Sequence, residues 1–370
     1  MHSFDVVVRG AGVVGLTAAL ALARQGLQVA LQGRPRAPGA GDIRAYALNA
    51  ASVALLDSLK VWSSLPDDAR CAVYDMQVSG DAAGASIGFS AWQQGVAQLA
   101  FIVDAAALED SLMAAVRFAP HVHVAAADAS LSGALQVLAE GTHSSSREAL
   151  GVHWQVDDYG QTALAARLVC EQPHAGVARQ WFRCPDVLAL LPFDRPEPRH
   201  SFGLVWSLPT ARAHELLAAD GASFEQLLNE ATAGSVGPLR LASERAAWLL
   251  LLAHASPLCG PGWVLVGDSA HRVHPLAGQG LNLGLADVAS LAQVLAGREP
   301  WRNLGDPILL RRHARQRAWP TLAMGRLTDG LLHLFAHDQA WARVLRNRGL
   351  SLVNGLPPLK RFLASQALDA

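Results

Sequence analysis

The sequence lacks three features that would each point to a particular class of protein. Its four cysteines, Cys71, Cys170, Cys184 and Cys259, lie far apart without a Cys-x-x-Cys pair. This favours a reducing compartment and argues against a disulfide framework or a metal site. No hydrophobic run reaches the length of a membrane span, and the stretch 246–253 is far too short. The formal net charge of −1 gives no general attraction to nucleic acid.

The chain also starts without the charged and then apolar pattern of a secretory leader, so a cytoplasmic protein is expected. Its 370 residues are enough for two domains. Hydrophobic residues make up 51% of the chain, and 32 glycines accompany them, which suits a globular α/β protein.

A glycine-rich stretch near the start carries the first functional signal. The segment VVVRGAGVVGLTAALALARQGLQVALQG, from Val6 to Gly33, predicts strand, helix and strand, the opening of a doubly wound parallel sheet. Gly10 permits a tight turn, Gly12 lets the backbone approach a pyrophosphate, and Gly15 lets the helix pack close to the strand. The helix N-terminus favours phosphate, so the segment predicts a dinucleotide site.

Two residues depart from this pattern. Arg9 stands at the strand end, where an apolar residue is usual. Gly33 stands where an acid normally accepts hydrogen bonds from the ribose of the adenosine. Losing a charged acceptor costs about 1.5–3 kcal/mol, so we expect loose binding of the dinucleotide. We also expect an acid introduced at position 33 to tighten it.

A second strand-to-helix turn lies at 262–295, in the segment GWVLVGDSAHRVHPLAGQGLNLGLADVASLAQVL. It predicts a buried strand, a loop and a helix from about 282 to 296. Asp268 follows the strand and can accept hydrogen bonds from a polyol. The helix N-terminus favours negative charge. The residues expected to form this helix N-terminus are Gly278, Gly280, Leu281 and Asn282.

This second stretch resembles the FAD-dependent aromatic hydroxylases, the family of para-hydroxybenzoate hydroxylase. It is most similar to the branch that hydroxylates polyprenyl phenols in ubiquinone biosynthesis. The resemblance implies that Asp268 binds the ribityl chain of FAD and that the following loop passes the isoalloxazine ring. The residues implied for catalysis are Pro275, Gly278 and Gln279. Those implied for cofactor binding are Gly10, Gly12, Gly15, Arg44, Glu140, Gly141, Asp268, Gly280, Leu281 and Asn282.

Other segments extend the resemblance over nearly the whole chain. The segment DIRAYAL places Arg44 where the family's Asp-x-Arg pair lies near the FAD pyrophosphate. The segment EGTHSSSR resembles the motif Asp-Gly-x-x-Ser-x-x-Arg, which serves FAD and NAD(P)H, with Glu140 in place of Asp. Residues 118–136 are fewer than in the family's hairpin region, and ADASLSGA is predicted to be a loop. This shortening bears on the small sheet of the FAD domain.

Closely spaced strand-like runs between 159 and 208 predict an antiparallel sheet. The expected fold is therefore α/β, with a Rossmann-like, doubly wound parallel sheet that binds FAD. An antiparallel substrate domain is inserted into it, and C-terminal helices follow. The expected boundaries are 1–70, 95–150 and 253–320 for the FAD domain, 71–94 and 151–252 for the substrate domain, and 321–370 for the C-terminal helical segment.

The implied activity is monooxygenation of the ring of a polyprenyl phenol. NAD(P)H would act as a transient reductant of FAD, and O₂ would give the C4a-hydroperoxide that hydroxylates the ring. One alternative is a flavin-poor paralogue that serves as a structural partner in a ubiquinone-biosynthesis complex; the residues Arg9, Gly33 and Glu140 favour it. A second alternative is a flavin dehydrogenase or oxidase on the same fold.

Several side chains could serve the substrate or only the structure. Three residues of the flavin loop could contact substrate or pyrophosphate, or merely hold the loop; these are His271, Arg272 and His274. Three tryptophans could line a pocket for a prenyl tail or pack in a core; these are Trp181, Trp206 and Trp248. Basic residues and leucines in 321–370 could meet the inner-membrane surface or a partner protein, or pack on the FAD domain.

Overall fold

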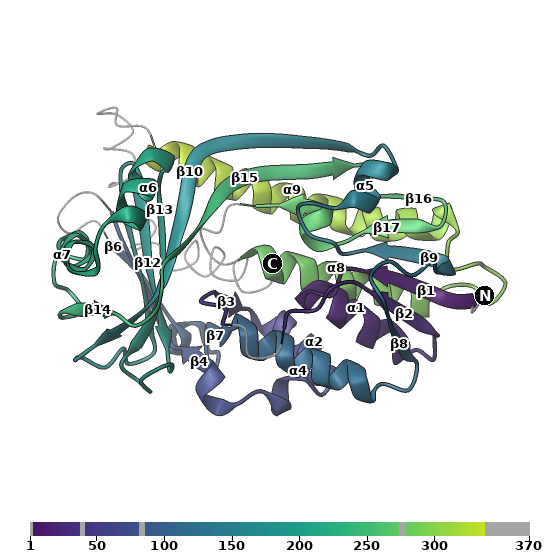
Figure 1. Ribbon diagram of the computed structural model, residues 1–370, viewed down its shortest axis with the longest axis horizontal. Coiled ribbons are helices and arrows are strands. Elements are labelled where there is room, and N and C mark those ends of the chain that lie inside the picture. Colours follow the sequence, from purple (N-terminus) through teal and green to yellow (C-terminus); the bar gives the residue numbers. More distant parts are fainter. Residues whose placement is uncertain (1–2, 38–40, 81–85, 274–278, 337–370) are drawn as a thin grey trace.

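The computed structural model describes residues 3–37, 41–80, 86–273 and 279–336. Two large sheets lie at opposite ends of the molecule (Figure 1). The first is six-stranded, with the order β16-β17-β9-β1-β2-β8. Its strands are β1 (Ser3–Arg9), β2 (Val29–Gln32), β8 (Val122–Ala125), β9 (Ser132–Leu138), β16 (Cys259–Gly260) and β17 (Trp263–Leu265).

This sheet is parallel apart from the short pair β16 and β17. Strand β9 begins at Ser132, inside the segment predicted to be a loop. That prediction was wrong because β9 pairs in parallel with β1 from Ser3 to Arg9, which requires the longer strand. The shortened region 118–136 therefore contributes two strands directly to the main sheet.

Helices pack against the parallel sheet and fill the space beside it. Helix α1 (Val13–Ala23) is apolar on all sides and almost entirely buried, as expected for a helix enclosed by other elements. Helix α4 (Ala105–Phe118) instead buries one stripe, formed by Leu108, Leu112 and Val116. The remaining helices here are α2 (Ala50–Ser58), α5 (Ser145–Ala149), α8 (Gln279–Ala296) and α9 (Pro307–Ala336).

The second large sheet has nine strands and the order β18-β15-β10-β13-β12-β11-β5-β6, with β14 beside β10. Its pairs are antiparallel except for β5 with β11. The strands are β5 (Asp75–Ser79), β6 (Ser86–Ser90), β10 (His153–Cys170), β11 (Val177–Arg183), β12 (Asp186–Phe193), β13 (Ser201–Pro209), β14 (Leu239–Leu241), β15 (Ala246–Ser256) and β18 (His271–Arg272). The predicted fold class, a parallel sheet with an inserted antiparallel one, is confirmed.

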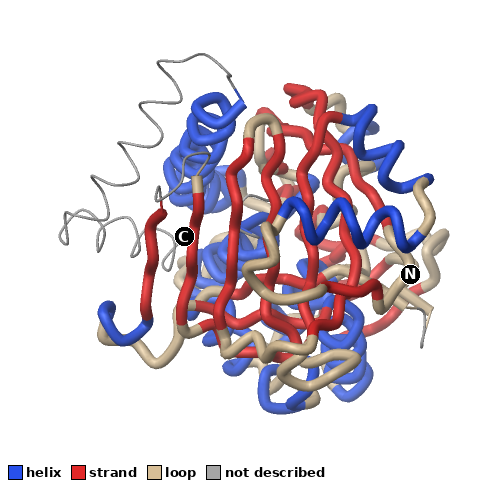
Figure 2. The backbone as a smooth tube through the Cα atoms, turned by 90° about the vertical axis from the view of Figure 1, so that its left-hand side faces the viewer, coloured by secondary structure: helices blue, strands red, loops and turns tan. Residues whose placement is uncertain are grey.

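Helices α6 (Thr210–Ala218) and α7 (Gly221–Ala231) cover the outer face of the antiparallel sheet, crossing in front of its strands in Figure 2. Trp206, Phe224 and Leu228 form part of the core beneath them. The opposite face of the sheet is turned toward the parallel sheet. A three-stranded sheet of β3 (Ala45–Leu48), β7 (Ala100–Asp104) and β4 (Arg70–Val73), and the short helix α3 (Ala91–Gln94), complete the described fold.

Helix α8 begins at Gln279, earlier than the predicted start near 282. The described part of the C-terminal helical segment belongs to α9, and residues 337–370 lie outside the described residues. Among the helices that the structure describes, none combines the length and the hydrophobicity needed to cross a membrane.

Candidate functional site

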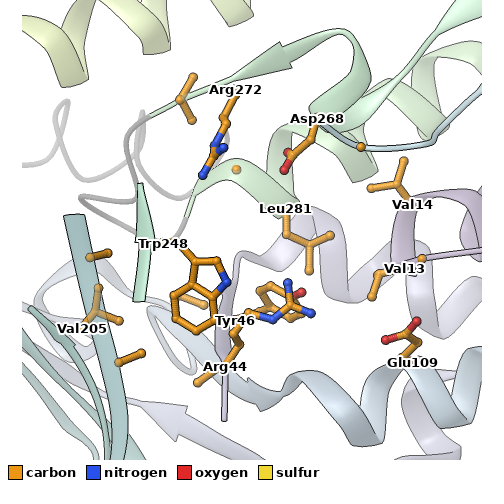
Figure 3. Close-up of a pocket in the computed structure, with 18 of the residues that line it drawn as sticks. Val13, Val14, Arg44, Tyr46, Glu109, Val205, Trp248, Asp268, Arg272 and Leu281 are labelled. Atoms are coloured by element: carbon orange, nitrogen blue, oxygen red, sulfur yellow. The ribbon is translucent and has the colours of Figure 1, made fainter. Parts of the chain in front are cut away.

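A cavity of about 850 Å³ extends from the N-terminus of α1 to the inner face of the antiparallel sheet (Figure 3). Val13, Val14 and Glu109 lie at one end of the view, and Trp248 and Val205 lie at the other. The parallel and the antiparallel sheet therefore line one continuous cavity. A cofactor bound at α1 and a substrate bound at the antiparallel sheet would share this space.

The glycines of the first motif have different roles in this geometry. Gly10 has a φ of 110°, and a Cβ there would lie 2.1 Å from the carbonyl oxygen of Ala139. A Cβ at Gly15 would lie 1.9 Å from the carbonyl oxygen of Gly10. At Gly12, which lines the cavity, a Cβ would meet nothing within 4 Å. Gly10 and Gly15 thus permit close packing, and Gly12 leaves space in front of the α1 N-terminus for a pyrophosphate.

Position 33 has no room for the acid that the motif usually carries. A Cβ at Gly33 would lie 2.7 Å from the backbone nitrogen of Ala11 and 3.1 Å from its Cβ. The expectation that an acid introduced here tightens binding therefore fails on steric grounds, because any side chain must first displace the turn before α1. Gln32, next to it, uses its Nε2 to donate to the carbonyl oxygens of Ala127 and Ala129.

Arg44 contributes a fixed positive charge to the cavity wall. Its Nε lies 3.0 Å from both carboxylate oxygens of Asp42, and its Nη2 lies 2.6 Å from Oδ2. This hydrogen-bonded pair raises the pKa of Arg44, although burial opposes the rise. Because Asp42 orients the planar guanidinium, Arg44 is positioned to bind an anionic group such as a phosphate.

Glu140 lines the cavity, but its carboxylate is engaged by its own helix turn. It accepts hydrogen bonds from Ser144 Oγ at 2.5 Å, Ser146 Oγ at 3.0 Å and Ser146 N at 3.1 Å. The extra methylene of glutamate lets the carboxylate reach these donors. Arg9, the other unusual residue, places its Nη1 3.4 Å from the same Ser146 Oγ. Gly141 has a φ of 78°, which turns the chain between the cavity wall and α5.

Arg147, the last residue of that motif, is buried and holds three segments together. Its Nη1 donates to the carbonyl oxygen of Ser269 at 3.2 Å, and its Nη2 donates to that of Thr142 at 2.8 Å. The guanidinium also lies 3.8 Å from the ring centroid of Trp154. Burial lowers the pKa of Arg147. Its contacts connect the segment 140–147 to the turn that carries Asp268.

The second motif supplies the opposite wall of the cavity. Asp268 opens onto it, and desolvation by the surrounding protein raises the pKa of its carboxyl group, although nearby Arg272 and Arg44 oppose the rise. Gly280 and Leu281, in the first turn of α8, also line it. The Asn282 side chain points elsewhere: its Oδ1 accepts from Asn49 N and Ser52 Oγ. Asn282 therefore fixes α8 to α2, and the predicted cofactor contact of its backbone stays a prediction.

The three residues implied for catalysis are placed in part. Gln279 is the first residue of α8. Pro275, Gly278 and His274 lie outside the described residues. His271 is buried and pairs with Asp287, so it holds the loop and does not face the cavity.

The antiparallel sheet forms a wide apolar chamber at the other end of the cavity. The pairing register sets Ala165, Val205 and Ala189 side by side on three neighbouring strands. The small residues of this floor are Ala163, Ala165, Ala178, Ala189 and Gly203. Trp248 lines the chamber, and Arg272 reaches into it (Figure 3). Trp181 and Trp206 instead pack in the core on the far face of the sheet.

Comparison with known proteins agrees with this geometry. A family model described as an FAD binding domain matches residues 90–318. The ubiquinone hydroxylase UbiL of Rhodospirillum rubrum is 32% identical over 98% of this chain and 89% of its own. The 3-demethoxyubiquinol 3-hydroxylase of Escherichia coli is 29% identical, with 98% of each chain covered.

Solved structures show the same fold. The p-nitrophenol 4-monooxygenase of Pseudomonas putida has a TM-score of 0.78 at 16% identity, covering 100% of this chain and 99% of that one. Klebsiella pneumoniae HpxO, solved with FAD and uric acid, has a TM-score of 0.74 at 18% identity, with 99% and 97% covered.

The chain belongs to the FAD-dependent monooxygenases that include the ubiquinone hydroxylases. The predicted family and cofactor are thereby confirmed. FAD is the cofactor of this monooxygenase, and NAD(P)H is the reductant typical of the family. The cavity fits the cofactor: space at Gly12 and the cation of Arg44 suit its pyrophosphate, and Asp268 offers an acceptor for its ribityl hydroxyls.

Two residues that anchor the segment 267–271 of this monooxygenase were missed from the sequence. Asp287 accepts from Arg317 Nε at 2.6 Å and from Gly267 N at 2.9 Å, and it also pairs with His271. An acid inside the apolar run of α8 was the available signal. Its partner Arg317, thirty residues away on α9, had none.

A cluster of buried Cys71 and His174 with partly buried Asp194 lies outside the cavity. His174 Nδ1 accepts a hydrogen bond from Gly176 N at 3.0 Å, so the neutral ring carries its proton on Nε2. That Nε2 lies 3.3 Å from Asp194 Oδ1 and 3.9 Å from Cys71 Sγ. Because a metal would need a lone pair on Nε2, the geometry favours hydrogen-bonded packing over a metal site.

Proposed function

We propose that this monooxygenase hydroxylates the ring of a polyprenyl phenol in ubiquinone biosynthesis. Two relatives, one named a ubiquinone hydroxylase and the other a 3-demethoxyubiquinol 3-hydroxylase, each cover 98% of this chain and support the pathway. The observation that carries the proposal is the continuity of the cavity from Gly12 to the alanine floor. A ring can lie against the cofactor end while an apolar tail occupies the chamber.

The described residues have different roles along the cavity. Reduced FAD would activate O₂ and supply the oxygen atom that is transferred to the ring. Trp248 offers an aromatic face against which a phenol ring can stack. Arg272 is held by the carbonyl oxygen of Leu249 at 2.8 Å and can donate to a phenolic oxygen. The N-terminal turn of α8 favours negative charge beside Leu281, because the helix dipole is positive there.

The roles of the motif residues follow from the same proposal. The backbone of Pro275, Gly278 and Gln279 would border the reacting ring. Asp268 would orient the cofactor through its ribityl hydroxyls. We further propose that the FAD domain comprises 1–70, 95–150 and 253–320, and the substrate domain 71–94 and 151–252.

The direct test is an oxygen-labelling experiment. Purified protein, loaded with FAD and given NADH or NADPH, is incubated with a short-chain prenyl phenol under ¹⁸O₂. We expect a product heavier by one ¹⁸O atom. Asp268→Ala should lose flavin and product together. Oxidation of the phenol without labelled oxygen would favour an oxidase, and a protein that takes up no FAD would favour the structural-partner role.

We also propose contact with an anionic membrane surface, since a polyprenyl substrate resides in lipid. The support lies on α9, where Arg311, Arg315 and Trp319 follow one another at helical spacing and are exposed. Trp319 is 74% exposed, and Ile308 on the same side is 49% exposed. Basic and aromatic residues on one helix face suit a lipid interface. The Trp319→Ala and Arg315→Glu variants should cosediment less with phosphatidylglycerol vesicles than the wild-type protein. Equal binding by the wild type and both variants would contradict this contact.

A further inference from the structure

The ribose-binding acid that is missing after β2 has a substitute in the described structure. Glu109 lies on α4, lines the same cavity as Gly12 and Gly33, and has a side chain that is 15% exposed. In Figure 3 its carboxylate lies at the same end of the cavity as Val13, the first residue of α1. An acid is therefore present at the end of the cavity where Gly12 and Gly33 lie, although it comes from a helix and not from the end of the second strand.

The loop that lost its acid is bound to the helix that supplies one. Arg36, three residues after Gly33, places its Nε 3.6 Å from Glu109 Oε2. Its Nη2 donates to the carbonyl oxygen of Ala106 at 3.2 Å and also pairs with Asp110. These contacts hold the loop across the second turn of α4. They fix where the Glu109 carboxylate lies relative to Gly33.

We propose that Glu109 takes over the role of the missing acid and accepts hydrogen bonds from the adenosine ribose of FAD. This inference rests on the proposed function, because it requires FAD in the cavity. A carboxylate can accept two hydroxyl donors at once, which is the recognition that the acid after the second strand normally provides.

The charges around Glu109 allow an acid so near a pyrophosphate. Burial raises the pKa of its carboxyl group, while Arg36 and Arg44 oppose that rise. Both guanidinium groups also offset repulsion between the carboxylate and phosphate oxygens. Position 33 itself stays closed to a side chain, since a Cβ there would lie 2.7 Å from Ala11 N.

The test measures the dissociation constants of FAD and FMN by flavin fluorescence, because FMN lacks the adenosine. Glu109→Gln and Glu109→Ala should weaken FAD binding about tenfold to a hundredfold, the range expected for a lost charged acceptor. FMN binding should not change. Asp110→Asn is the matched control, since Asp110 also pairs with Arg36 but is 55% exposed and is not among the described residues that line the cavity.

Two results would overturn the inference while leaving the proposed function intact. The first is unchanged FAD affinity in both Glu109 variants. The second is an equal loss for FAD and FMN, which would mean a general effect on the cavity. A wild-type protein that binds no FAD would instead overturn the proposed function, and this inference with it.

Discussion

His271 Nε2 lies 2.7 Å from Asp287 Oδ2, and both side chains are almost fully buried. Burial disfavours a charged His271, but the attraction and hydrogen bond of Asp287 outweigh it and raise the pKa of the imidazole. The pKa of Asp287 is lowered: burial works against its charge, but His271 and Arg317 prevail. One carboxylate thus joins the segment 267–271, α8 and α9.

Asp287→Asn should destabilise the protein strongly, because it leaves His271 and Arg317 buried beside a neutral amide. Breaking a buried ion pair on one side costs about 3–5 kcal/mol. The free energy of unfolding, measured with urea, checks this. Asp68→Asn removes an exposed pair with Arg195 and should change it by less than about 1 kcal/mol. Equal effects of the two substitutions would contradict the assigned role of Asp287.

Gly12→Ala and Gly15→Ala should separate binding from folding. A methyl group at Gly12 meets no protein atom within 4 Å, so the melting temperature of the flavin-free protein should stay the same while FAD affinity falls at least tenfold. A methyl group at Gly15 would lie 1.9 Å from the carbonyl oxygen of Gly10, so that variant should melt at a lower temperature. Wild-type FAD affinity in Gly12→Ala would show that no phosphate approaches there.

Much of this site could be predicted from the sequence, because glycine turns and strand-to-helix motifs are local. Gly10, Gly12 and Asp268 needed no knowledge of tertiary contacts. The closed space at Gly33 could not be foreseen, since Ala11 approaches it only after the two strands pair. The position of Glu109 depends in the same way on how α4 packs beside α1.

Trp248→Ala and Trp206→Ala should affect different properties, although both residues belong to the antiparallel sheet. Trp206 is 1% exposed in the core under α6 and α7, so its truncation should cost about 3–5 kcal/mol of folding stability. Trp248 lines the cavity, so its truncation should raise KM for a phenol about tenfold with little change in stability. An unchanged KM in Trp248→Ala would show that the phenol ring does not bind against Trp248.

The protein should lose stability in mild acid because His313 is buried. Burial lowers its pKa to about 4, although Asp287 partly opposes this. The unfolded chain binds a proton near pH 6.5, whereas the folded protein does not until about pH 4. Stability therefore falls as the pH drops through this interval, by at most about 3 kcal/mol. His313→Gln, which can still bond to Ser290, should flatten melting temperatures measured from pH 7 to pH 4. An unchanged slope would contradict the prediction.

Strands β10 and β15 run side by side from the parallel sheet to the alanine floor (Figure 1). Trp154, near one end of β10, packs on Arg147, and Ala163 and Ala165 lie farther along. The one irregularity in this pairing lies around Gly160, between Asp158 and Gln161. An inserted or deleted residue would shift the floor by about 3.3 Å and turn every side chain beyond it to the opposite face. A change in side-chain size along the floor can therefore alter the substrate range, whereas a change in strand length would also disturb the contact of Trp154 with Arg147.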